Sequence, residues 1–244
     1  MTSSTGRVKA DLREMYNRLA DGYSTAFDSA AGRYFMRRKI EAMLDLGRFT
    51  RGGHLVEIGC ADGAFTLEIG RLGFRITGLD LSPECIRVAA QRVRQAGLTE
   101  LNFAVADAEN LTNICNDTFD GAFSFSALRY VSDAAASIRE LFRVVRCGAA
   151  VVVDFPNSWS PWFTFLKPLL TGETHIHDHR YTTGQVVAMM QAAGFRDVTA
   201  RRILFTPKTT PGWILPALKA ADYIGERTPG LNQLAAIIMV GGRK

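Results

Sequence analysis

His54-Leu-Val-Glu-Ile-Gly-Cys-Ala-Asp-Gly63 is the stretch that decides the fold of this 244-residue chain. Its first five residues, His54–Ile58, form an apolar run that predicts a short buried strand. Gly59 and Gly63 follow, and the apolar pattern of Ala64–Leu72 then predicts a helix. A strand that passes through a glycine turn into a helix is typical of a nucleotide-binding loop, because glycine lets the backbone turn sharply and approach a ligand closely.

The same alternation continues along the chain. Arg75–Leu79 predicts a second strand, and Ser82, Pro83 and Glu84 then form a typical helix start, with Ser82 as N-cap. That helix is expected to end at Gln95 or Ala96, before a glycine. Strands alternating with helices at this spacing predict a mostly parallel sheet with helices on both faces. Further strands are expected at Leu101–Val105, Phe119–Phe125, Ala149–Asp154, Val198–Phe205 and Ala235–Val240, and further helices at Ala134–Val145 and after a capping box of Thr182 and Gln185.

Composition limits the class of protein. A hydrophobic fraction of 47% is enough for a packed core, and the net charge of +5 comes from scattered Lys and Arg, so no nucleic-acid partner is expected. The N-terminus lacks the apolar core of a secretory signal, and no apolar run is long enough to span a membrane. The expectation is a cytoplasmic protein, at most peripheral to a membrane, of open oligomeric state. Its four cysteines lie far apart, which suits a reducing compartment and no zinc knuckle: Cys60, Cys85, Cys115 and Cys147.

One domain is expected over 1–244, because the length fits one large α/β unit. Within it we expect a helical cap at 1–46, a cofactor-binding core at 47–155, and lid insertions with the last two strands at 156–244. The insertions, 156–170 and 206–231, are rich in aromatic residues and proline and follow predicted strands. Ligands of open α/β sheets bind beyond the carboxyl ends of strands, so both insertions are expected at the ligand side.

Two carboxylates follow predicted strands at positions that suit a nucleoside. Asp80 ends the second strand, where it can accept from both ribose hydroxyls, and Asp107 follows the third, where it can accept from an adenine amine. Together with the glycine loop, these segments resemble, in order and spacing, the motifs of the class I S-adenosylmethionine-dependent methyltransferases, in their small-molecule branch. The matching segments are VEIGCADG (56–63), GLDLS (78–82), VADAENL (105–111), FDGAFSFSALRYV (119–131) and RVVRCGAAVVVD (143–154).

This resemblance implies a Rossmann-like sheet of seven strands in the order 3-2-1-4-5-7-6, with the last strand antiparallel. It implies S-adenosylmethionine as cofactor, S-adenosylhomocysteine as product, and in-line transfer of the methyl group. The N-terminal YNRLADGYSTAFD (16–28) resembles the family's helical segment, in which an aromatic side chain, Tyr23 or Tyr16, closes over the cofactor. The implied cofactor contacts are Asp80 (ribose), Leu81 (adenine face), Asp107 and Ala108 (adenine edge), Gly59, Cys60, Gly63 and Ser124 (methionine part), Glu57 (its ammonium) and Tyr23.

A nicotinamide dehydrogenase is the competing α/β interpretation. Its G-x-G-x-x-G fingerprint needs a middle glycine, and here Ala61 stands between Gly59 and Gly63. The extra Cβ would crowd a pyrophosphate, and Asp62 inside the loop would repel its charge. A sulfonium cofactor has no pyrophosphate, so the sequence favours the methyltransferase.

Three histidines at alternate positions, His175, His177 and His179, leave three interpretations open. On a strand they would share one face and could bind a metal, although nothing in the family requires one. One of them could instead be a general base or an anchor for the acceptor. The third interpretation is a polar loop before the next helix.

The acceptor is expected to be small and hydrophobic or lipid-like, methylated on O, C or N. The Asn/Asp-Pro-Pro-aromatic motif of nucleic-acid amino-methyltransferases is missing after the fourth strand, where 124–127 reads SFSA. Two other functions stay open: a noncatalytic cofactor-binding scaffold, or a peripheral membrane protein that inserts Trp162, Phe165, Lys167, Trp213 and Lys219. The expected acceptor pocket comprises Arg129, Tyr130, Trp159, Trp162, Phe163 and Trp213, although the aromatic residues could instead form the core of the lid itself.

Overall fold

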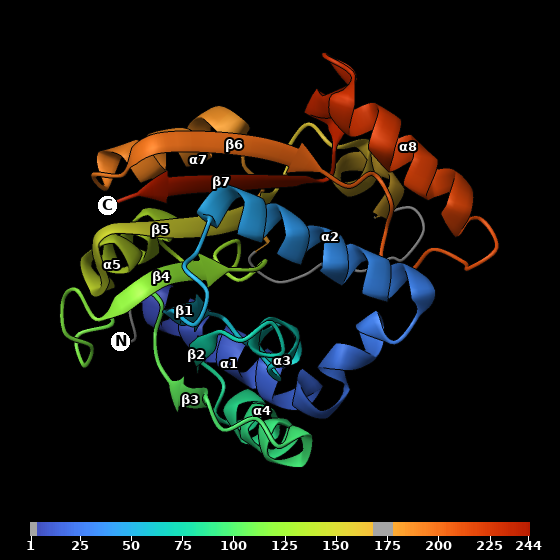
Figure 1. Cartoon of the computed structure of the whole chain (residues 1–244). Coiled ribbons are helices and arrows are strands. Elements are labelled where there is room, and N and C mark those ends of the chain that lie inside the picture. The colour runs from blue at the N-terminus through green and yellow to red at the C-terminus, as the bar shows by residue number, and fades with distance from the viewer. Residues whose placement is uncertain (1–3, 168–177) are drawn as a thin grey trace.

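A seven-stranded sheet in the order β3-β2-β1-β4-β5-β7-β6 forms the centre of the computed structural model, which describes residues 4–167 and 178–244 (Figure 1). β7 pairs antiparallel with both β5 and β6, and the other neighbours are parallel. The predicted fold class and strand order are therefore confirmed. The strands are β1 (His54–Ile58), β2 (Arg75–Asp80), β3 (Leu101–Val105), β4 (Phe119–Ser124), β5 (Val145–Pro156), β6 (Arg196–Ile203) and β7 (Ile237–Arg243).

The helices begin and end largely where the local sequence predicts. Ser82 accepts a hydrogen bond from the Cys85 N–H, and Gly97 ends the same helix in the left-handed conformation. Thr182 and Gln185 form the expected capping box. The helices are α1 (Ser4–Leu19), η1 (Ala20–Phe27), α2 (Ala30–Gly47), α3 (Ala64–Gly70), α4 (Pro83–Ala96), α5 (Ala134–Val144), η2 (Trp162–Leu166), α7 (Thr183–Ala192), α8 (Leu215–Arg227) and η3 (Leu231–Leu234).

Several elements differ from the prediction. β6 begins and ends two residues earlier than expected, and β7 begins two residues and ends three residues later. β5 is longer than expected at both ends, since it runs from Val145 to Pro156 alongside β7. The insertion at 206–231 contains α8, which was not predicted because its prolines and glycines suggested an irregular segment. The proposed subdivision of the domain at 46 and 155 stays a prediction.

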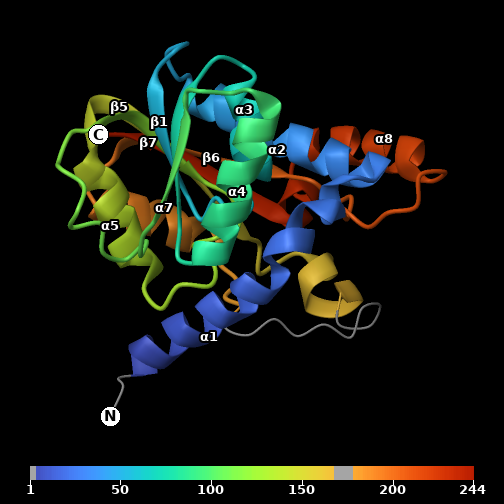
Figure 2. The ribbon, with the colours of Figure 1, turned by 90° about the horizontal axis from the view of Figure 1, so that it is seen from below.

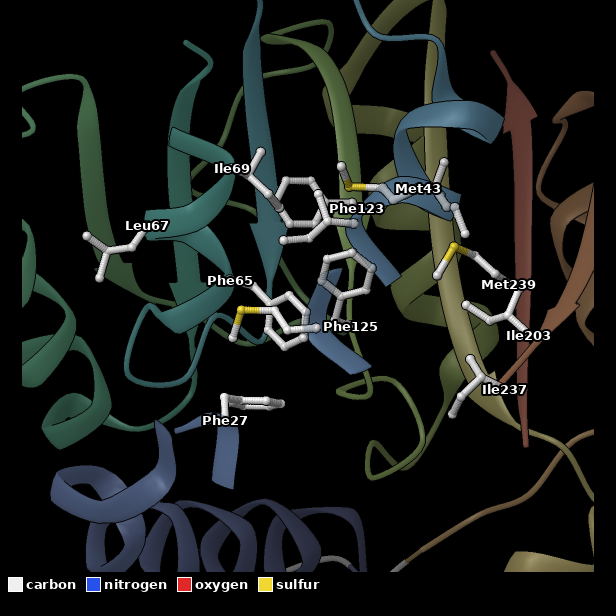
Figure 3. Packing of buried hydrophobic residues seen from close by; sticks show 14 of the residues in the cluster. Phe27, Met43, Phe65, Leu67, Ile69, Phe123, Phe125, Ile203, Ile237 and Met239 are labelled. Carbon is white, nitrogen blue, oxygen red and sulfur yellow. The ribbon is translucent and has the colours of Figure 1, made fainter. Parts of the chain in front are cut away.

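Apolar side chains alternate along the strands and build one core on each face of the sheet. Leu55 of β1 joins the core under α2, α3 and α4, whereas the next residue, Val56, joins the core under α5 and α7. Figure 3 shows the first of these cores, in which Phe65 from α3 packs against Phe125 with ring centroids 4.6 Å apart. Both layers expected of a doubly wound sheet are therefore present.

The N-terminal helices cover one edge of the sheet. α1 and η1 contact α4, and α1 extends along one side of the molecule toward the N-terminus (Figure 2). Among the described residues, no helix is long and apolar enough to cross a membrane. The cover places side chains from the first 27 residues over the loops that carry the predicted motifs.

Candidate cofactor and acceptor site

A cavity of about 780 Å³, open mouth included, lies between α1 and the loops that follow β1, β2, β3 and β4. It therefore lies at the carboxyl edge of the sheet, where ligands of this fold class bind. Seven of the predicted site residues line it: Tyr23, Gly59, Asp80, Leu81, Asp107, Ala108 and Tyr130.

The glycine loop leaves bare backbone at the cavity. Gly59 has a φ of +73°, and a Cβ there would lie 2.0 Å from the Cβ of Ala127 in the loop after β4. Gly63 has a φ of +78°, and a Cβ there would lie 3.0 Å from the Cβ of Ala89. No larger residue fits at Gly59 without moving the two loops apart, so the glycine is required by both conformation and space.

Asp80 presents an oriented carboxylate to the cavity. Its oxygens accept the N–H of Ala61 at 2.8 Å and the N–H of Ser82 at 2.9 Å. Burial raises the pKa of this carboxyl, and hydrogen bonds from the backbone of Ser82, Ala61 and Leu81 oppose the rise. A carboxylate has about four acceptor positions, so part of its accepting capacity remains for a ligand's hydroxyls.

Asp107 and Ala108 lie together at the wall of the cavity, as predicted for the adenine edge. Asp107 accepts the Glu109 N–H at 3.0 Å and pairs with Lys9 at 2.6 Å. Lys9 also pairs with Glu109, so α1 is attached to this edge by one cation and two carboxylates. Sequence analysis missed Lys9, because one lysine in a charged helix carries no signal of such a contact.

Four of the residues predicted to hold the methionine part lie behind the cavity wall. Glu57 is 1% exposed, accepts the Thr66 hydroxyl, and has a pKa that burial raises to about 8. The Ser124 hydroxyl donates to the Ile58 carbonyl at 2.9 Å. Cys60 and Gly63 are also absent from the lining. These residues support the glycine loop from inside, and their direct contact with a cofactor stays a prediction.

Three tyrosines form one side of the cavity. The Tyr16 ring lies 6.0 Å from that of Tyr23 and 6.1 Å from that of Tyr130, centroid to centroid. Burial raises the pKa of Tyr16 and of Tyr23, which keeps both phenols neutral. The two alternatives for the closing aromatic residue, Tyr16 and Tyr23, therefore both lie at the cavity.

Hydrogen bonds fasten this cover to the core. The Ser82 hydroxyl donates to Asn17 Oδ1 at 2.6 Å, and the Ser24 N–H donates to the carboxylate of Asp62 at 2.9 Å. Arg92 pairs with the same carboxylate at 2.8 Å. Asp62 is fully buried and absent from the cavity wall, so the expectation that its charge would repel a phosphate is wrong. Crowding by the Cβ of Ala61 still disfavours a pyrophosphate at the glycine loop.

A buried ion pair that the sequence analysis missed lies behind the loop after β4. Lys39 of α2 is 1% exposed and pairs with Asp154 of β5 at 2.6 Å. Lys39 also donates to the Ser126 hydroxyl at 2.8 Å, and Asp154 accepts the Ser126 N–H at 2.5 Å. Ser126 lines the cavity in the left-handed conformation, with a φ of 58°. The pair therefore fixes the backbone of one cavity wall.

Arg129 connects the loop after β4 to the segment before α7. Its guanidinium makes two hydrogen bonds to the carboxylate of Asp178 and lies 5.1 Å from the centre of the Phe163 ring. The His179 N–H donates to the Arg129 carbonyl at 3.0 Å, and His179 is not among the residues that line the cavity. His175 and His177 lie outside the described residues, so the three interpretations of the histidines stay open.

The predicted acceptor residues are brought together only in part. Arg129 lies over the rings of both Tyr130 and Phe163, 5.2 Å and 5.1 Å from their centres, and Tyr130 lines the cavity. Trp159 is 67% exposed and Trp213 is 83% exposed, and neither lines the cavity, nor does Trp162. Their role in an acceptor pocket stays a prediction.

The residues present fit S-adenosylmethionine. Asp80 has free acceptor positions for a ribose diol, Gly59 and Ala61 present backbone where a pyrophosphate would need a further glycine, and the tyrosines offer π faces, which attract cations. When bound, this cofactor supplies a methyl group on a positively charged sulfur. The sheet order and this cavity are those expected of a methyltransferase that uses S-adenosylmethionine.

Proteins similar in sequence to this chain are also methyltransferases. A family model described as a methyltransferase domain matches residues 56–153. A methyltransferase, phqN of Penicillium fellutanum, is 31% identical over 157 residues, which cover 59% of this chain and 46% of the fungal protein. The chain thus aligns with less than half of that relative.

Solved structures support the fold over nearly the whole chain. A methyltransferase from Thermotoga maritima, described as a possible histamine N-methyltransferase, has a TM-score of 0.69 and 18% identity and covers 96% of this chain and 99% of its own. The cyclase SpnF has the same TM-score and identity, with coverage of 97% and 96%. Residues 56–153 therefore match the methyltransferase-domain family, and the chain as a whole has the class I methyltransferase fold.

Proposed function

We propose that this protein transfers the methyl group of S-adenosylmethionine to a small, largely apolar acceptor in a cytoplasmic setting. The observation that carries the proposal is a single cavity that combines the oriented carboxylate of Asp80 with a wall formed by Tyr16, Tyr23, Tyr130 and Phe125. A polar end suits the nucleoside, and aromatic faces suit a flat or apolar acceptor.

The chain's own task is to position the two reactants and exclude water, because a sulfonium methyl needs no protein nucleophile. α1 covers the cavity through Leu12 and Tyr16, which shield it from solvent. The neutral phenols of Tyr16 and Tyr23 can donate a hydrogen bond to an acceptor oxygen or nitrogen.

No histidine lines the cavity within the described residues. An acceptor that ionises easily, such as a phenol or enol, or an amine with a free lone pair, therefore suits this wall better than an aliphatic alcohol. His179, and His175 and His177 outside the described residues, stay candidates for a base or an acceptor anchor.

The names of similar proteins are compatible with this substrate class. The fungal relative is named a methyltransferase, and the Thermotoga protein, which shares the fold, is described as a possible histamine N-methyltransferase, a description that names a small amine as its substrate. Lys and Arg are scattered along the sequence and form no long run, so nucleic acid is not proposed as the acceptor.

The test has two stages, each with its own control. Calorimetric titration should show binding of S-adenosylmethionine and S-adenosylhomocysteine but not of NAD, and Asp80→Asn should weaken it. Incubation with methyl-labelled cofactor and fractionated cell extract should then label a small organic-soluble product, and the same reaction with Asp80→Asn should label less. Label only in nucleic acid or protein would contradict the proposal.

A noncatalytic or non-transferring protein is the second candidate. The specific observation is that SpnF, which has the same fold, is named as a cyclase. Tight binding of the cofactor without label transfer to any fraction would favour this alternative.

A further inference from the structure

Helix α8 places its acidic residues on its inner side and leaves several apolar side chains in solvent, although Leu215 at its start is buried in the core. Its only two acidic residues, Asp222 and Glu226, face the protein: Asp222 is 0% exposed, and the Glu226 side chain is 10% exposed. In contrast, Tyr223 is 61% exposed and Ile224 is 58% exposed. A surface helix normally turns its apolar face inward, so this arrangement needs a reason.

The inward acids have a definite structural task. Three consecutive residues after β6 have their N–H groups directed at α8: Leu204 donates to Glu226 at 3.0 Å, Phe205 to Asp222 at 2.5 Å, and Thr206 to Asp222 at 3.0 Å. Glu226 also pairs with Arg38 of α2 at 2.5 Å. These contacts fix the rotation of the helix, because backbone N–H groups left without acceptors in the interior would be costly.

The fixed rotation leaves a continuous apolar stripe in solvent. Trp213, just before the helix, is 83% exposed, and the stripe continues at intervals of three and four residues, the spacing of one helix face. No acidic residue of α8 lies on it, because both acids face inward. The exposed members of the stripe are Trp213, Pro216, Ala217, Ala220, Tyr223 and Ile224, with the cations Lys219 beside it and Arg227 at its end.

We propose that this stripe docks the protein on an anionic phospholipid bilayer, with α8 lying in the plane of the interface. Trp and Tyr prefer the boundary between headgroups and acyl chains, and Lys and Arg next to them are attracted to anionic lipids. Charge complementarity favours an anionic lipid surface as the partner of the stripe, because the stripe carries positive charge and no negative charge. Arg227 stacks 3.8 Å from the centre of the Tyr223 ring, so a cation and an aromatic residue are presented together.

A second copy of the chain fits the stripe less well. The stripe runs from Trp213 to Arg227, and its midpoint is next to Lys219. A two-fold pairing of two such helices would therefore place the Lys219 side chains of both copies close together, where like charges repel.

A second exposed apolar segment lies at the same end of the molecule. Trp159 is 67% exposed and Phe165 is 70% exposed, in the insertion that follows β5. This insertion, gold in the colour scale, and α8 both project on the right-hand side of Figures 1 and 2. That side is also where the arrows of β4 and β6 point in Figure 1, so a membrane there would face the carboxyl edge of the sheet, whose loops line the cavity.

Vesicle flotation tests the inference without cofactor or turnover, so its result is independent of the proposed function. The full chain should float with vesicles of equal parts phosphatidylglycerol and phosphatidylcholine, and much less with phosphatidylcholine alone or in high salt. Lys219→Gln with Arg227→Gln should weaken binding about 25-fold, at about fivefold per cation. Trp213→Ala with Ile224→Ala should weaken it about 10-fold or more.

Matched controls lie elsewhere on the surface. Arg51→Gln with Arg94→Gln makes the same change in net charge, and Val105→Ala removes an apolar side chain that is 53% exposed on β3. Both should bind vesicles like the unaltered protein. The inference is overturned if the unaltered protein does not float with anionic vesicles, or if the α8 variants float as well as the controls. It is equally overturned if sedimentation velocity shows a dimer that Trp213→Ala dissociates.

Discussion

Replacing Lys39 by methionine tests whether the buried ion pair behind the cavity holds the loop after β4. Methionine has a similar length and suits the surroundings, since the Lys39 ammonium lies 4.9 Å from the centre of the Phe125 ring and 5.3 Å from that of Phe65. The substitution therefore removes the charge with little change in packing. Asp154, which is 1% exposed, is left as a buried carboxylate whose only remaining hydrogen-bond donor in the structure is the Ser126 N–H.

Removing one partner of a buried ion pair typically costs about 3–5 kcal/mol, because the other charge stays buried without compensation. For a chain of this size, about 2–4 °C of melting temperature corresponds to each kcal/mol, so Lys39→Met should lower the melting temperature by about 6–20 °C. Lys39→Met with Asp154→Asn should recover most of this loss. The amide carries no charge, and its oxygen can still accept the Ser126 N–H.

Differential scanning calorimetry of the three proteins at neutral pH gives the comparison. The reasoning is refuted if the single variant melts within 2 °C of the unaltered protein, or if the double variant melts no higher than the single one. S-adenosylhomocysteine affinity adds a second readout. We expect weaker binding in the single variant and recovery in the double variant, because Ser126 forms part of the cavity wall.

Three further predictions follow from the residues around the glycine loop. Asp80→Asn should weaken S-adenosylmethionine binding, measured by calorimetry, by about 10- to 150-fold through loss of one charged hydrogen bond. Asp80→Ala should in addition lower the melting temperature, because the Ala61 N–H loses its acceptor. The pKa of Glu57 in the folded protein, about 8, exceeds the ordinary 4.5, so the free energy of unfolding should fall by up to about 1.4 kcal/mol per pH unit as the pH rises between those values. Urea titrations of Glu57→Gln should show a smaller fall. An identical pH profile for the two proteins would contradict the raised pKa. Gly59→Ala should destabilise the fold by about 2 kcal/mol or more. Adding Ala127→Gly should recover only part of this stability, because the left-handed conformation at position 59 stays unfavourable for alanine. Full recovery would show that only the clash with the Ala127 side chain matters.

Much of the core of the site could be predicted because its signals are local. Gly59 and Asp80 stand directly at the ends of strands whose apolar runs are plain in the sequence, and parallel strands bring such positions to one edge. The fold, the strand order and seven lining residues follow from that rule together with the family resemblance.

Residues supplied by other elements could not be found in this way. Lys39 did have a signal, since it lies beside Met36, Ile40 and Met43 on the face of α2 that is buried, and a lysine there needs an acidic partner. Its partner, Asp154, lies more than a hundred residues away, so only the folded structure pairs them. Lys9 has no comparable signal.

The orientation of helix α8 could not be predicted from the sequence for a different reason. Sequence periodicity places apolar residues inward by default, but here the N–H groups of Leu204, Phe205 and Thr206 bind the acids of the helix and turn its apolar side to solvent. The deciding interaction joins backbone groups to side chains, and backbone groups leave no trace in a hydropathy pattern. A long-range hydrogen-bond requirement therefore overrode the hydrophobic rule at this helix.

Asp107 is a carboxylate that the cover of the cavity contacts and that, as the resemblance implies, the cofactor would contact as well. Asp107 already uses its Oδ2 for Lys9 and its Oδ1 for the Glu109 N–H, so an adenine amine that binds Asp107, as the resemblance implies, must share or replace the Lys9 contact. Lys9 retains Glu109 as a partner when it leaves Asp107, which keeps the cost of this exchange low. Because Lys9 and Tyr16 belong to the same helix, occupation of the adenine edge is coupled to the position of the aromatic wall at which the acceptor is proposed to bind. The N-terminal helix thus connects the two halves of the site, and its sequence carries that connection in residues that no motif would have singled out.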